Sequence, residues 1–80
     1  MKWRFDPELK VRLVDDEIVV TLPGTSYFVT YYKMIGSPGL LAKRIADTDD
    51  PRIPRMRVSE FLAKAWKLAN DKARELGWLV

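Results

Sequence analysis

Apolar and polar residues alternate in the first half of the chain, which is the pattern of a half-buried β-sheet. Three segments rich in β-branched and aromatic residues predict strands over residues 9–14, 17–22 and 27–34. Asp15-Asp16 suits a tight turn between the first two strands, because aspartate tolerates left-handed backbone angles. Residues 23–26, Pro-Gly-Thr-Ser, have the composition of a second turn. The first half therefore predicts a three-stranded antiparallel meander.

The two turns also predict how the strands pair. If Val14 and Glu17 flank the first turn, one face of the sheet is uniformly apolar. Its cross-strand pairs are Leu13 with Ile18, Val11 with Val20, Leu9 with Leu22, Leu22 with Tyr27, Val20 with Val29 and Ile18 with Tyr31. The opposite face, hereafter the outer face, is predicted to be mixed: Lys10, Arg12, Val14, Glu17, Val19, Thr21, Phe28, Thr30, Tyr32 and Met34.

The second half of the chain has the pattern of helices. Ser37 and Pro38 fit the cap and first position of a short helix, which we expect over about residues 38–46. Residues 47–57 contain two prolines and predict an extended surface loop. A longer helix is predicted to begin with Ser59 as its cap and to end before Gly77. Its apolar stripe should pack on the apolar sheet face: Phe61, Leu62, Ala65, Trp66, Leu68, Ala69, Ala73 and Leu76.

The predicted fold class is α+β: a three-stranded antiparallel meander packed against a C-terminal amphipathic helix, with the short extra helix near 38–46. With 80 residues, 48% of them hydrophobic and 31% charged, the chain is expected to form one small domain over residues 1–80 with a packed core. It contains no histidine and no cysteine. This composition excludes a histidine-based triad, a thiol nucleophile, a zinc site of ordinary ligands and a disulfide.

Sequence features of the chain point away from catalysis, cofactors and membranes. The carboxylates at Asp47, Asp49 and Asp50 lack the glycine and the glutamate that a calcium loop requires, so we expect no bound metal and no cofactor. No apolar run is long enough for a membrane span or a signal peptide. We expect a cytoplasmic protein that is not an enzyme.

The outer face and the C-terminal tail predict a contact surface. Aromatic and aliphatic side chains there need shelter from water, which the N-terminal segment with Trp3 and Phe5, the short helix or a second copy of the protein can provide. The function we expect is protein–protein interaction or homo-oligomeric assembly. The predicted contact residues are Val19, Phe28, Tyr32, Met34, Trp78 and Leu79.

The alternative function is nucleic-acid binding through the outer face and the basic loop. Aromatic rings on a sheet stack bases, and cations bind phosphates. The basic residues available for this are Lys10, Arg12, Arg52, Arg55 and Arg57. The loop aspartates can neutralise the three arginines, which is the structural explanation of the same pattern.

The segment from Glu60 to Trp78, with Leu22-Pro-Gly-Thr-Ser-Tyr27 before it, resembles small bacterial proteins of similar length and unassigned function. The resemblance implies no activity, ligand or functional residue.

Overall fold

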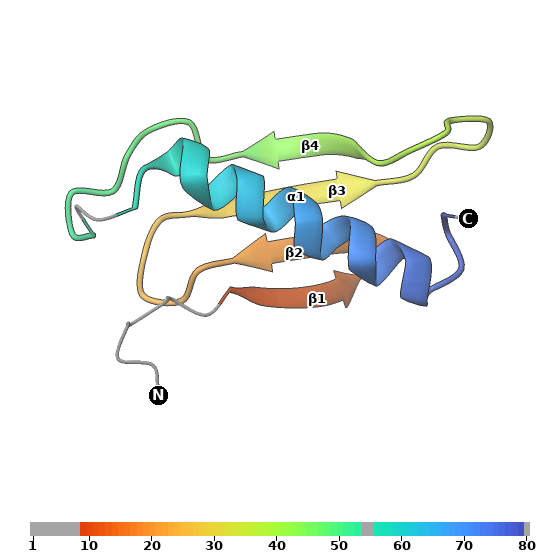
Figure 1. Cartoon of the computed structure of the whole chain (residues 1–80), viewed down its shortest axis with the longest axis horizontal. Helices are drawn as coiled ribbons and strands as arrows, with labels where there is room; N and C mark the ends of the chain where they lie inside the picture. Colours follow the sequence, from red (N-terminus) through yellow and green to blue (C-terminus); the bar gives the residue numbers. More distant parts are fainter. Residues whose placement is uncertain (1–8, 54–55, 80) are drawn as a thin grey trace.

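The computed structural model describes residues 9–53 and 56–79, in which four antiparallel strands form one sheet in chain order (Figure 1). The strands are β1 (Lys10–Val14), β2 (Glu17–Thr21), β3 (Phe28–Tyr32) and β4 (Leu41–Ile45). The first three strands confirm the predicted meander and its register, with Leu13 opposite Ile18, Val11 and Val29 opposite Val20, and Tyr31 opposite Ile18.

The turn between β1 and β2 has the backbone that the two aspartates predicted. Asp15 and Asp16 have φ angles of 48° and 62°. Positive φ at both central residues is the requirement of a type I′ turn, whose twist matches that of the adjoining strands. The second turn is closed by hydrogen bonds from the N–H groups of Leu22 and Thr25, and Gly24 supplies its positive φ of 83°.

The predicted short helix over 38–46 is wrong, because β4 occupies that segment. β4 pairs with β3, placing Leu41 opposite Tyr32 and Arg44 opposite Thr30. Leucine, alanine, lysine and arginine are among the best helix formers, but propensity differs by less than about 1 kcal/mol per residue, and backbone pairing satisfies the edge of β3 that would otherwise remain open. Tertiary pairing therefore overrides local propensity in this segment.

Helix α1 (Val58–Glu75) crosses one face of the sheet obliquely (Figure 1). It contacts β1, β2 and β3, and within the described residues it does not reach β4. The helix presents one large side chain and three small ones to the sheet. The buried helix residues are Phe61, Ala65, Ala69 and Ala73, and they pack with Ile18, Val20, Val29 and Tyr31. Tyr27 and Phe61 stack with ring centroids 5.3 Å apart. No helix in the described segments is both long and apolar enough to span a lipid bilayer.

The two ends of α1 differ in how well the sequence predicted them. The predicted cap, Ser59, is wrong: Arg57 is the N-cap residue, and the carboxylate of Asp49, distant in sequence, accepts a 2.8 Å hydrogen bond from the N–H of Val58. The C-terminal end is confirmed. Gly77 has a φ of 81°, and the N–H of Trp78 donates to the carbonyl of Ala73 at 2.8 Å, which is a Schellman motif.

Candidate nucleic-acid interface

The outer face of the sheet lies opposite α1. Because the helix packs on Ile18 and Val20, alternation along each strand directs the intervening side chains to the other side. β1, β2 and β3 contribute the predicted outer positions, and β4 adds three that the sequence analysis assigned to a helix. The outer face therefore consists of Lys10, Arg12, Val14, Glu17, Val19, Thr21, Phe28, Thr30, Tyr32, Leu41, Lys43 and Arg44.

Aromatic and aliphatic side chains form the centre of the outer face. Phe28 is 39% exposed, and Tyr32, four residues further along the same strand, is partly exposed. Thr30 lies between them and is buried, with Val19 beside it on β2. Since β3 is an interior strand that begins at Phe28 and ends at Tyr32, the two aromatic residues lie at its two ends, between the edge strands.

Cationic side chains flank this aromatic centre from both edge strands. One cross-strand row runs Arg12, Val19, Thr30 and Arg44, so it has an arginine at each end. The row of Phe28 ends at Lys10 on β1. All of these basic residues are exposed. The outer face thus has cationic edges around an aromatic centre.

A β-bulge brings one further cation onto the outer face. The register between β3 and β4 shifts between Thr30 and Tyr31, so that Lys43 is the extra residue of β4. Its ammonium group pairs with the carboxylate of Glu17, which lies on β2 across the intervening strand. Glu17 is the one acidic residue among the outer positions.

Met34 lies outside this face, because β3 ends at Tyr32. It belongs to the connection between β3 and β4, where it is 52% exposed and its neighbour Ile35 is fully exposed. The tail residues Trp78 and Leu79 are half-buried and pack against the protein's own core. That packing accounts for the apolar character of the tail.

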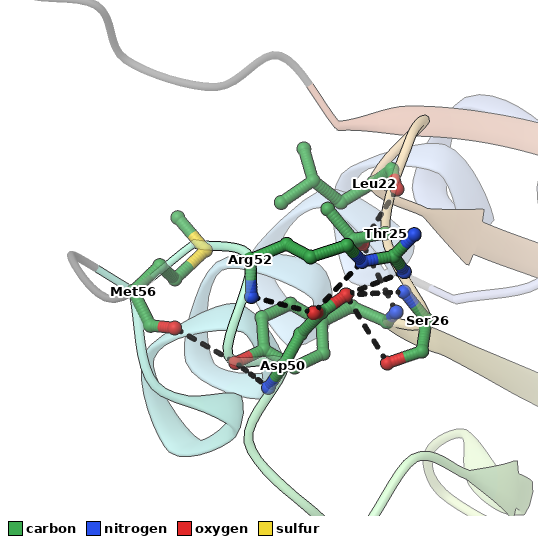
Figure 2. Close-up of polar contacts among 7 residues, drawn as sticks. Leu22, Thr25, Ser26, Asp50, Arg52 and Met56 are labelled. Carbon is green, nitrogen blue, oxygen red and sulfur yellow. Dashed lines mark hydrogen bonds and ion pairs between the residues drawn. The ribbon is translucent and has the colours of Figure 1, made fainter.

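The basic loop is tied to the protein through Asp50 (Figure 2). The Asp50 carboxylate, 3% exposed, accepts hydrogen bonds from the N–H groups of Ser26 and Arg52, both at 2.9 Å. The Arg52 guanidinium forms a bidentate ion pair with it, at 3.1 and 2.9 Å. Tyr27 completes the cluster, since its hydroxyl accepts from the N–H of Asp50 and donates to the carbonyl of Met56.

These contacts give Asp50 and Arg52 structural roles. The guanidinium of Arg52 and the backbone N–H groups hold the pKa of Asp50 well below its ordinary value of 3.8, because all of them favour the ionised carboxylate. The pairing also raises the pKa of Arg52. Arg52 binds the buried carboxylate through its Nε and Nη2 atoms while its side chain stays 63% exposed, and the predicted phosphate-binding role of the basic loop remains a prediction.

The other predicted residues of the loop have different positions: one caps α1, one is exposed on the surface, and one lies outside the described residues. Asp49 caps α1, and Arg57 is exposed at its N-cap. Arg55 lies outside the described residues, as do Trp3 and Phe5 of the N-terminal segment, so the predictions that name them are not tested. Within the described segments, no three acidic residues cluster as metal ligands would.

The sequence matches no protein-family model, and the comparisons with curated proteins and with solved structures gave no significant match.

Proposed function

We propose that this protein is a non-catalytic binding domain and that its outer face binds nucleic acid. The observation that carries the proposal is the distribution of charge. Lys10, Arg12, Lys43 and Arg44 against Glu17 give the outer face a formal net charge of +3, which equals the +3 of the whole sequence. The charges at all other positions of the sequence sum to zero, so the outer face carries a positive excess that the rest of the chain does not.

Concentrated positive charge beside exposed aromatic rings fits a polyanion that carries bases. Cations attract phosphates and release their counterions, which supplies sequence-independent affinity. Aromatic side chains stack on the faces of bases. Aromatic rings are also enriched at protein–protein interfaces, so the titrations described below compare a nucleic acid with an acidic polypeptide.

The charge distribution also argues against self-association through this face. If two outer faces packed together, each cationic edge strand of one copy would meet a cationic edge strand of the other. Like charges opposed in an interface are unfavourable. We therefore rank a nucleic-acid partner above the homo-oligomer that the sequence predicted.

The structural role of Asp50, the carboxylate whose pKa is shifted, supports a function without catalysis. Catalytic acids and bases are recognised by a shifted pKa in a cleft open to substrate. Asp50 has the shifted pKa, but its oxygens are occupied by Ser26 and Arg52 and almost no surface remains exposed. Its environment is that of a structural anchor.

Oligonucleotide titration at several salt concentrations tests the proposal. We expect a fluorescein-labelled oligonucleotide to bind with an affinity that falls steeply with salt, and the variant Arg12→Ala/Arg44→Ala to reduce the slope of log K against log salt by about 1.5. Lys64→Ala, an exposed cation on the solvent side of α1, is the matched control and should leave the slope nearly unchanged. Absence of binding at low salt would contradict the proposal.

A second candidate function is self-assembly through β4, the mode of association that one specific observation favours. Leu41 and Ile45 are 37% and 45% exposed, and α1 does not cover this edge strand. Lys43 and its bulge oppose edge pairing. Sedimentation equilibrium decides the matter: a dimer that Leu41→Glu dissociates and Leu13→Glu, at the opposite edge, leaves intact would support assembly, and a monomer at high concentration would exclude it.

A further inference from the structure

We propose that the outer face selects single-stranded nucleic acid over duplex, with Phe28 and Tyr32 as the stacking residues. This inference rests on the proposed function, because it names the form of nucleic acid that the same face binds. It depends on three properties of the outer face: where the rings lie, how far apart they are, and which side chains are missing around them.

The rings lie where a base can reach them only if it is unpaired. Phe28 and Tyr32 are the first and last residues of β3, an interior strand of the sheet, and both retain exposed surface. In a duplex the faces of the bases are stacked on one another, and only base edges are accessible from the grooves. A ring on the outer face can therefore stack on a base of a single strand but not on a base within a helix.

The spacing of the rings also requires an unstacked strand. Tyr32 lies four residue steps after Phe28, which corresponds to roughly 13 Å along a β-strand. Successive bases of a duplex strand are about 3.4 Å apart. Two bases seated on these rings therefore belong to a strand whose bases have separated, with phosphates running toward the cations of β1 and β4.

The outer face lacks the amide side chains that commonly read base edges in a duplex. Asparagine and glutamine form bidentate bonds to adenine in the major groove. Asn70, on α1, is the one asparagine of the chain, and the sequence contains no glutamine. Arg12 and Arg44 remain available, and at the edges of the sheet they are placed to bind phosphates.

Three ligands of one length separate stacking from simple charge attraction. They are a single strand, its duplex, and an abasic strand that keeps the phosphates and lacks the bases, each titrated by fluorescence anisotropy. With three or four phosphates neutralised, single-strand affinity should fall by about 20- to 50-fold between 50 and 200 mM salt. We expect the duplex and the abasic strand to bind at least 10-fold more weakly than the single strand.

Variants at the rings provide the second arm of the test. Phe28→Ala should lower single-strand affinity by roughly 5- to 100-fold, as expected for one lost stacking contact, and should leave affinity for the abasic strand unchanged. Phe28→Trp should retain binding. Ile35→Ala, which removes an exposed apolar side chain from the connection between β3 and β4, outside the outer face, is the matched control and should have little effect. Circular dichroism and urea unfolding establish that each variant is folded. The comparison of the abasic strand with the single strand uses the wild-type protein, so it does not depend on any variant.

The outcomes separate this inference from the proposed function. Equal affinity for single strand, duplex and abasic strand would overturn the inference and leave charge-driven nucleic-acid binding intact. No affinity for any of the three would overturn both. Equal binding of poly-glutamate and of the single strand would show that the face recognises charge alone, as an acidic protein partner requires, and would also overturn both.

Discussion

Removing one hydroxyl group, in the variant Tyr27→Phe, tests the cluster that fastens the β4–α1 connection to the rest of the fold. The Tyr27 side chain is 1% exposed and its ring stacks on Phe61. Its hydroxyl donates to the carbonyl of Met56 at 2.7 Å and accepts from the N–H of Asp50 at 2.9 Å. Phenylalanine preserves the ring and its stacking, so the substitution removes these two hydrogen bonds and creates no large cavity.

The expected cost follows from what the substitution leaves behind. The Met56 carbonyl and the Asp50 N–H are both buried, and each would lose its partner. A buried polar group without a partner costs about 1–3 kcal/mol, so the free energy of unfolding should fall by about 2–5 kcal/mol. Small domains have a total stability of about 5–15 kcal/mol. The melting temperature should therefore fall by roughly 10–30 °C.

Urea and thermal unfolding followed by circular dichroism measure this change. Tyr32→Phe is the matched control, because the Tyr32 side chain is partly exposed on the outer face and its hydroxyl can be replaced by water. The control should change stability by less than about 0.5 kcal/mol. If Tyr27→Phe and Tyr32→Phe had the same unfolding midpoint, the hydroxyl of Tyr27 would not anchor the connection and the reasoning would be refuted.

Three further predictions concern the turn, the helix and acid stability. Asp16→Gly should raise stability by about 0.5 kcal/mol, because glycine adopts the observed positive φ without steric cost; a lower melting temperature would contradict this. Ala69→Leu should cost about 1–3 kcal/mol in urea unfolding, since this fully buried alanine lets α1 approach the sheet. Ala63→Leu, at an exposed position of the same helix, should be nearly neutral, and equal effects would refute the packing argument. Because the pKa of Asp50 is lower in the folded than in the unfolded state, its contribution to stability is complete above about pH 4 and is lost as the pH falls through the folded pKa. Asp50→Asn should therefore be less stable than wild type at pH 6 and lose less stability between pH 5 and pH 2, and parallel pH profiles of the two proteins would count against the anchoring role.

The meander was predictable because its information is local. Side chains alternate with a period of two along a strand, and a two-residue turn fixes the register of the strands that it joins. Asp15 and Asp16 indicated that turn in the sequence, and the observed pairing of Leu13 with Ile18 follows from it. The end of α1 at Gly77 was predictable for the same reason, since the Schellman motif is completed within a few residues.

β4 and the start of α1 were not predictable from local sequence. Residues 41–45 consist mostly of good helix formers and become a strand because β3 offers an unpaired edge. The first turn of α1 is capped by Asp49, from beyond the neighbouring prolines, and not by Ser59. In both cases the partner, β3 for the strand and Asp49 for the helix, is brought close by the fold and not by nearness in the sequence.

Some residues of the candidate site were predictable from the sequence, and others were placed only by the tertiary structure. Lys10, Arg12, Phe28 and Tyr32 were assigned to the outer face by alternation alone, and the register places them there. Lys43 and Arg44 joined them only through the pairing of β4. Arg52 was a candidate that its sequence neighbours could have neutralised, and the buried carboxylate of Asp50 shows that one of them does.

The sequence by itself determined the α+β class, the meander with its register, the C-terminal helix and the mixed character of the outer face, because periodicity and turn chemistry act over a few residues. The tertiary structure alone decided that a fourth strand extends the sheet, that its cations complete a second basic edge, and that the loop aspartates accept hydrogen bonds from the first turn of α1 and from Ser26. Those outcomes depend on hydrogen bonds between residues far apart in the chain, which only the folded backbone brings within reach.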